Sequence, residues 1–177
     1  INKQIKLIEK LVNEFSDFAR MPKPIFKKNE LNKIIKDSIN LMKTNDKDIV
    51  INFNTEEVHY VNSDTEQLNR VFINLLKNSI ESLKEKHQKT GDFKKKIDVE
   101  IQLINDYISI VVQDNGTGFT NNDLKTLSKP YFTTKKEGSG LGLSIVEKIL
   151  NDHNGFIEFI SQKEGAKIKI LLPKYVN

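Results

Sequence analysis

The sequence predicts an α+β domain, a two-layer α/β sandwich with helices on one face of a β-sheet, preceded by a separate bundle helix. Two observations predict this fold. Amphipathic helical patterns are interspersed with strand patterns, and the two clearest strand patterns are consecutive, as in an antiparallel hairpin at the centre of a sheet. The 177 residues are enough for one domain of about 150 residues and a short extension.

The bundle helix is predicted from an a/d pattern, in which apolar residues recur at alternating steps of four and three. The residues are Ile1, Ile5, Ile8, Val12, Phe15 and Ala19. A lone helix this apolar is unstable in water, so we expect it to pack on its own domain or on a partner helix. Pro22 and Pro24 end it and stiffen the chain that follows. We therefore expect a partial helical domain at 1–22, a hinge at 23–28 and a main domain at 29–177, all cut from a longer protein.

Within the main domain, helical patterns occupy residues 31–42, about 63–86 and 144–151. Strand patterns occupy residues 49–53, 97–103, 108–112, 156–160 and 166–172. Ser63 and Glu66 match the capping box that begins a helix. Turns at Asn105-Asp106 and at Lys163-Glu164-Gly165 would join the central and the final strand pairs.

The composition excludes several classes of function. With no cysteine, the chain has no disulfides, thiolate metal sites or cysteine nucleophiles. A net charge of +4, from 28 basic and 24 acidic residues, is spread along the chain without interleaved aromatic residues, so no nucleic-acid partner is expected. No apolar stretch approaches the roughly 20 residues that span a bilayer. We expect a cytoplasmic domain, and leave open whether the parent protein is anchored in a membrane.

A polar stripe lies along the helix predicted at 63–86. It contains Arg70, Asn74, Lys77, Asn78 and Glu81, opposite the apolar face. Two amides one turn apart are presented together, and an amide oxygen is a hard ligand that can hold Mg²⁺ without cancelling its charge. The alternative is that the stripe is the solvated side of an amphipathic helix.

The segment 114–119 follows directly on the second strand of the central hairpin. Asp114 is suited to accept a hydrogen bond from an exocyclic amine, while Gly116 and Gly118 let a flat ring approach the main chain. Asn-Gly is also the commonest two-residue hairpin turn, so a purely structural role stays open here.

The glycine-rich segment 138–143 precedes the helix predicted at 144–151. Glycines before a helix N-terminus leave N–H groups free to face an anion, and phosphate is the natural ligand. The spacing matches neither the dinucleotide fingerprint nor the P-loop, and a flexible lid tip is the alternative. The preceding residues 120–137 have little apolar periodicity, which indicates a functional loop, such as a lid over a phosphate, or disorder.

Together, residues 74–78, 114–119, 130–135 and 138–143 resemble the N, G1, F and G2 boxes of bacterial sensor histidine kinases in order and spacing. Residues from about 29 to 174 look like the catalytic ATP-binding domain of that family, which has the Bergerat (GHKL) fold. Residues 1–22 are similar to the second dimerisation helix of NtrY-type nitrogen-regulation kinases.

The resemblance implies a role for each matching residue. Asn78 would be the Mg²⁺ ligand, Asn74 and Lys77 would lie near the phosphates of ATP, and Asp114 would hold the adenine amine. The remaining contacts to the nucleotide would come from Gly116, Gly118, Phe132, Thr133, Thr134, Gly138, Ser139, Gly140, Leu141, Gly142 and Leu143. Lys135 of the lid would join Asn74 and Lys77 in acting on the transferred phosphoryl group. The family passes the γ-phosphoryl group of ATP to a histidine and then to an aspartate of a response regulator.

One departure from the family pattern concerns the acceptor histidine, which lies on the first dimerisation helix. His59, His87 and His153 do not match it, so we expect binding of ATP and Mg²⁺ without autophosphorylation of this chain. The expected partners are the histidine-bearing helix of the parent protein, a second copy of it, and a response-regulator receiver domain.

Two alternatives remain. Other Bergerat-fold ATPases share such boxes but carry a glutamate base one turn before the metal asparagine, where this chain has Asn74. A nucleotide-sensing or dimer-forming module without activity is the second alternative.

Overall fold

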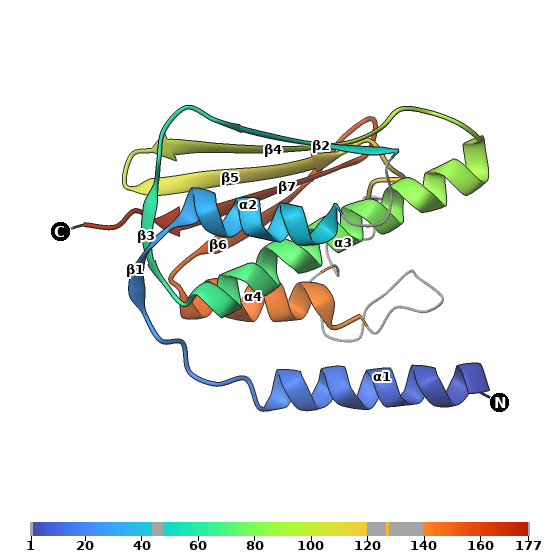
Figure 1. Cartoon of the computed structure of the whole chain (residues 1–177), viewed down its shortest axis with the longest axis horizontal. Helices are drawn as coiled ribbons and strands as arrows, with labels where there is room; N and C mark the ends of the chain where they lie inside the picture. Colours follow the sequence, from blue (N-terminus) through green and yellow to red (C-terminus); the bar gives the residue numbers. More distant parts are fainter. Residues whose placement is uncertain (1, 44–47, 120–126, 128–139, 177) are drawn as a thin grey trace.

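The computed structural model describes residues 2–43, 48–119, 127 and 140–176. It forms two layers, a five-stranded sheet and three helices that cover one of its faces (Figure 1). The helices are α2 (Leu31–Met42), α3 (Thr65–Thr90) and α4 (Gly142–Asp152). The strands of this sheet are β2 (Ile49–Thr55), β4 (Lys95–Ile104), β5 (Tyr107–Asp114), β6 (Phe156–Ser161) and β7 (Ala166–Pro173). The predicted two-layer α+β fold is confirmed.

The strand order in the sheet is β2-β4-β5-β7-β6. The predicted hairpin of β4 and β5 is antiparallel, and β5 is the central strand. Strand β2 pairs with β4 in parallel, and the chain between them passes through α3. The helix α3 is therefore the crossover of a parallel strand pair, which fixes it against the sheet from both ends.

The core lies between the sheet and the three helices. Alternate residues of neighbouring strands face the helices, as in the cross-strand pairs Val99–Val112 and Ile101–Ile110. The predicted apolar face of α3 is buried, with Leu68 and Leu75 at 0% exposure. Burial of this face on the sheet is what holds the polar side of α3 in a fixed position.

Two strands were not predicted. Strands β1 (Lys27–Glu30) and β3 (Tyr60–Ser63) form a separate two-stranded antiparallel sheet, with Lys27 opposite Ser63. Strand β1 lacks alternating apolar residues, so its sequence gives no strand signal. It begins within the predicted hinge at 23–28.

The start of α3 differs from the prediction. Asp64, not Ser63, is the N-cap residue, and its carboxylate accepts a hydrogen bond from the Gln67 N–H at 3.1 Å. Ser63 is instead the last residue of β3. The helix also continues past Lys86 to Thr90, where Gly91 takes a φ of +83° and ends it.

Helix α1 (Asn2–Ala19) lies apart from the two layers, to which residues 20–26 connect it (Figure 1). Four members of its predicted a/d row, Ile5, Ile8, Val12 and Phe15, are between 49% and 59% exposed. Of the two expected modes of packing, this exposure favours a partner helix. No described helix is both long enough and apolar enough to cross a membrane.

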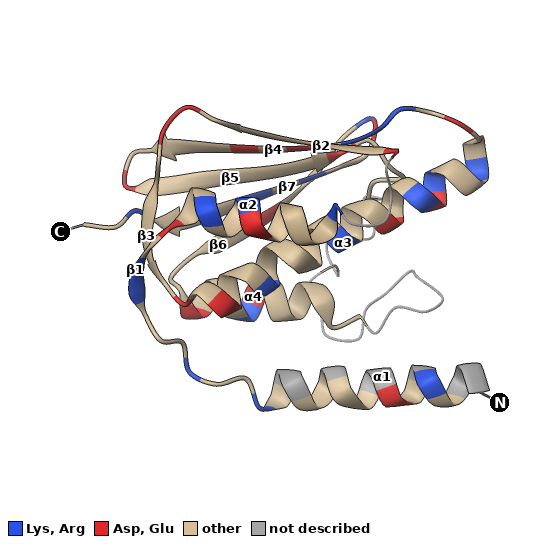
Figure 2. Cartoon of the chain, in the orientation of Figure 1, with Lys and Arg blue, Asp and Glu red and all other residues tan. Residues whose placement is uncertain are grey.

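Charged residues of both signs are interspersed over the strands and helices (Figure 2). Glu158 of β6 is opposite Lys169 of β7, and the Lys96 ammonium lies 2.7 Å from the Asp98 carboxylate on β4. The small excess of positive charge is therefore spread over many elements of the described chain.

Candidate functional site

One side of α3 carries a row of polar residues at steps of four: Asn74, Asn78, Ser82 and Lys86. Residues four apart lie on one face of a helix. At one end of this row Asn74 faces the start of α4, and at the other end Ser82 and Lys86 contact the turn after β5. The helix therefore connects the two glycine-containing segments that the sequence singles out.

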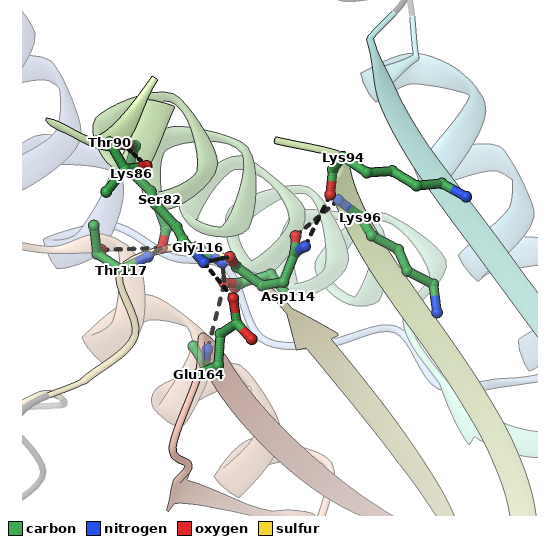
Figure 3. A network of polar contacts seen from close by, with 11 residues as sticks. Ser82, Lys86, Thr90, Lys94, Lys96, Asp114, Gly116, Thr117 and Glu164 are labelled. Carbon is green, nitrogen blue, oxygen red and sulfur yellow. Dashed lines mark hydrogen bonds and ion pairs between the residues drawn. The ribbon is translucent and has the colours of Figure 1, made fainter. Parts of the chain in front are cut away.

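Asp114 is the last residue of β5 and is 4% exposed. Its Oδ1 atom accepts hydrogen bonds from the N–H groups of Gly116 at 2.9 Å and Ala166 at 3.3 Å (Figure 3). Burial raises the pKa of the Asp114 carboxyl above its usual value, and hydrogen bonds from Gly116 and Ser79 partly oppose this rise. A buried acceptor is thus held in place at the end of the central strand.

The glycines around Asp114 have no room for side chains. A Cβ at Gly116 would lie 2.8 Å from the carbonyl carbon of Ser82 on α3. Gly118 and Gly165 both have positive φ angles, +74° and +73°, and a Cβ at Gly165 would overlap the main-chain oxygen of Asp114. The turn after β5 therefore packs directly on α3 and on the β6–β7 turn.

Lys86 fastens this turn to α3. Its ammonium group donates to the main-chain oxygen of Asn115 at 2.7 Å and to Glu164 Oε1 at 2.6 Å, and it lies 4.8 Å from the centre of the Phe93 ring. The Asn115 side chain is hydrogen-bonded to the main chain at the start of β4, where its Oδ1 atom accepts from the Lys96 N–H at 2.9 Å (Figure 3).

The Ser79, Ser82 and Lys86 side chains were not predicted from the sequence. The spacing of four that begins with Asn74 and Asn78 continues through Ser82 and Lys86, so extending that step along the helix would have found two of them. Ser79 carries no such signal.

Asn74 faces the first residue of α4. Its amide nitrogen donates to the Arg70 main-chain oxygen at 2.9 Å, and its Oδ1 atom lies 3.4 Å from where a Gly142 Cβ would be. Leu141 is 1% exposed, and its side chain packs in the core. Gly140 has a φ of +70°, and Leu143 packs partly against the core.

Of the other expected site residues, Lys77 is exposed and Asn78 is partly buried on α3. Except for residue 127, the expected lid at 120–137 lies outside the described residues, and so do six expected site residues: Phe132, Thr133, Thr134, Lys135, Gly138 and Ser139. Among the described residues, no three His, Asp or Glu side chains converge as a metal site.

Comparison with known proteins decides the family. Residues 63–176 match the family described as histidine kinase-, DNA gyrase B- and HSP90-like ATPases. The chain belongs to this ATPase family. An NtrY-like sensor histidine kinase of Rickettsia conorii is 37% identical over 166 residues, which cover 92% of this chain and 26% of that protein. The resemblance to sensor histidine kinases is confirmed, and the chain spans about a quarter of such a relative.

Solved structures of the histidine kinase ThkA share the fold of this ATPase domain. The ThkA catalytic domain is 28% identical with a TM-score of 0.73, and the match covers 85% of this chain and 96% of that chain. A structure of ThkA in complex with the response regulator protein TrrA matches 98% of this chain and 49% of that chain, with 23% identity and a TM-score of 0.76.

Proposed function

We propose that this chain binds ATP as the catalytic domain of a sensor histidine kinase and transfers the γ-phosphoryl group to a histidine on a dimerisation helix of the parent protein. The observation that carries the proposal is Asp114, a carboxylate 4% exposed at the end of β5 beside glycines that cannot carry side chains. The family and its NtrY-like relatives support it.

Asp114 would recognise the adenine ring. The Asp114 carboxylate accepts from the N–H groups of Gly116 and Ala166, and the Ser79 and Ser82 hydroxyls also donate to it. An exocyclic amine would suit this site, because a carboxylate accepts hydrogen bonds and repels a carbonyl oxygen. Gly116 and Gly118 would border the ring with their main chain, which packs closely on α3 and on the β6–β7 turn because neither residue has a side chain.

The phosphates would lie between α3 and the start of α4. Asn74, Lys77 and the main chain of Gly140, Leu141, Gly142 and Leu143 would contact them, and the N-terminus of α4 favours negative charge. Asn78 would hold Mg²⁺, because a neutral amide oxygen fits this hard cation and the described residues offer no cluster of acidic ligands. Bound Mg²⁺ supplies neutralisation of the charge on the phosphates.

The lid would complete the site. Phe132, Thr133 and Thr134 would close over the nucleotide, and Gly138 and Ser139 of the glycine-rich segment would contact the phosphates beneath it. Lys135 would act with Asn74 and Lys77 on the transferred group. Asn74 cannot serve as a base for water, since a side-chain amide is not basic. Its nitrogen is hydrogen-bonded to the Arg70 main-chain oxygen. This favours transfer to a protein acceptor over rapid ATP hydrolysis.

The acceptor histidine would come from the parent protein and not from this chain. His59 and His153 are buried, at 7% and 3% exposure, and His87 lies near the end of α3, 3.5 Å from Asp92. We therefore expect no autophosphorylation of the isolated chain, and acid-labile label from radiolabelled ATP on the chain would contradict this. In the parent protein, a second copy and a response-regulator receiver domain are the proposed partners; the complex of ThkA with the response regulator protein TrrA supports the second of these.

Calorimetry with ATP and Mg²⁺ tests the proposal. Asp114→Asn should weaken binding about 10- to 100-fold, because it removes a hydrogen bond to a charged acceptor worth about 1.5–3 kcal/mol. Asp106→Asn is the matched control, since Asp106 lies in the β4–β5 turn and pairs with Lys174 on the surface. Equal affinity of Asp114→Asn and the unmodified chain, or no heat from the unmodified chain, would refute adenine recognition at Asp114.

A further inference from the structure

The segment that connects α1 with β1, residues 20–26, is hydrogen-bonded to the main domain. The Ile25 N–H donates to Asp64 Oδ2 at 2.8 Å, and Gln67 Nε2 donates to the Pro22 main-chain oxygen at 2.9 Å. Met21 also packs against the edge of the core. Two main-chain groups of this segment are thus held by side chains from the first turn of α3.

Asp64 uses its two carboxylate oxygens for two different tasks. Oδ1 caps α3 by accepting from the Gln67 N–H, and Oδ2 accepts from Ile25 in the connecting segment. Although partial burial acts to raise the pKa of Asp64, hydrogen bonds from Ile25 and Gln67 lower it below its usual value. The charged form therefore serves both bonds at once.

His153, which follows the last residue of α4, completes the contact. Its Nε2 atom accepts from the Asp64 N–H at 3.0 Å, so the ring proton is on Nδ1, which donates to the Ile149 main-chain oxygen at 2.8 Å. The Phe26 ring packs edge-on against this imidazole, with the centroids 5.1 Å apart. The connecting segment therefore touches the ends of both α3 and α4.

We propose that Asp64, Gln67 and His153 form a linker clamp that fixes the direction in which α1 leaves the catalytic domain. The clamp holds Pro22 to Phe26, and α1 ends at Ala19, after which the Arg20 N–H still donates to the Ser16 oxygen at 2.9 Å. Few residues between the end of α1 and the clamp are therefore without a contact to the catalytic domain. Only Arg20 and Met21 lie between the end of α1 and the clamp, and Met21 packs against the core, so the predicted hinge at 23–28 would be rigid.

The clamp has a consequence for phosphoryl transfer, which rests on the proposed function. Asp64 caps the same helix that carries Asn74 and Asn78. A fixed exit direction for α1 would set where these residues lie relative to the dimerisation helices. The three clamp residues would thus be positioning residues, with no contact to the nucleotide.

The experiment uses Asp64→Ser together with Gln67→Met in the full chain. Serine is a good N-cap residue but has one oxygen, so the cap of α3 is kept while the bond to Ile25 is lost. Methionine keeps the length of Gln67 without its donor. The control is Asp37→Ser, an exposed acid on α2.

Hydrogen exchange at the Ile25 amide is the first measurement. Loss of a hydrogen bond to a charged acceptor should speed its exchange about 10- to 100-fold in the double variant and leave it unchanged in the control. Since the chain has no cysteine, spin labels can be placed at Asn13→Cys and Lys163→Cys, both exposed. The distribution of distances between the two labels should be narrow in the chain without the Asp64 and Gln67 substitutions and broader in the double variant.

The proposal is overturned if the Ile25 amide exchanges as fast in the unmodified chain as in the double variant. It is also overturned if the distribution of label distances is equally broad with and without the two substitutions. Should the double variant not fold, Phe26→Ala tests the same clamp without touching α3 and should broaden the distances as well. Calorimetry with ATP separates this outcome from failure of the proposed function, because ATP affinity should be the same in all of these variants.

Discussion

The Lys86 ammonium group lies 2.7 Å from the main-chain oxygen of Asn115, the residue that follows Asp114. This bond joins the second half of α3 to the turn that carries the proposed adenine acceptor. The Lys86 side chain is 18% exposed and also pairs with Glu164, so its charge is largely shielded from solvent. We therefore expect Lys86 to position Asp114 through the turn, without contact to the proposed nucleotide.

Lys86→Met should weaken ATP binding about 10-fold, because the turn after β5 loses its cationic anchor and Asn115 loses its donor. Lys86→Arg keeps a cation at this place and should recover most of the affinity. Calorimetry well below the melting temperature of each variant measures the effect. If Lys86→Met binds ATP like the unmodified chain, Lys86 has only a structural role.

Gly165→Ala should destabilise the fold and weaken ATP binding together. Its φ is +73°, and the new Cβ would overlap the Asp114 main-chain oxygen, so β5 and the β6–β7 turn must separate. Gly91→Ala is the matched control, because its φ is +83° but no atom lies within 4 Å of the new Cβ. In the control, only backbone strain lowers the free energy of unfolding, by about 1–3 kcal/mol. Urea unfolding and calorimetry should show Gly165→Ala less stable than Gly91→Ala, and only Gly165→Ala impaired in binding.

The stability of the chain should fall below about pH 6.5 because of His153. Burial lowers the pKa of His153, and the hydrogen bond to Ile149 offsets only part of this decrease. The folded state therefore binds a proton at His153 less readily than the unfolded state does. The contribution of neutral His153 to the free energy of unfolding is fully present above the pKa that His153 has in the unfolded chain. It is lost as the pH falls toward the lower pKa that His153 has in the folded chain. The loss is at most about 1.4 kcal/mol per pH unit. Urea unfolding at a series of pH values measures it, and His153→Gln should flatten this part of the profile.

Asn78→Ala should abolish the gain in ATP affinity that Mg²⁺ provides, because the proposed amide ligand is removed. In the presence of EDTA, the variant and the unmodified chain should bind ATP alike. Asn151→Ala, at an exposed asparagine on α4, should behave like the unmodified chain under both conditions. A full Mg²⁺ effect in Asn78→Ala would place the metal elsewhere.

Elements with a clear hydrophobic period could be predicted from the sequence. Helix α2 agrees with its predicted bounds, and β4 and β5 were found because Ile97 to Val112 alternate around an Asn-Asp turn. Strand β1 could not be found, because its residues Lys27 to Glu30 are held by main-chain pairing with β3 and not by burial of an apolar row. Such pairing depends on where a distant segment lies in three dimensions.

The polar site was predictable where it depends on local spacing. Asn74 and Asn78 follow from the period of α3, and Asp114 follows from its place at a strand end. The contact of Lys86 with Glu164 joins residues 78 positions apart, and Asp64 Oδ2 accepts from Ile25, 39 positions away. No local pattern specifies such contacts, because they arise only when α3 lies across the sheet.

The family match begins at residue 63, yet α2 contributes Leu31, Ile34, Ile35 and Ile39 to the core, and β2 forms an outer strand of the sheet. The part of the chain that must fold together is therefore larger than the part that the family pattern covers. A recombinant protein trimmed to residues 63–176 would expose one side of β4 and part of the apolar surface of α3. Expression boundaries for biochemical work on this domain belong upstream of β1.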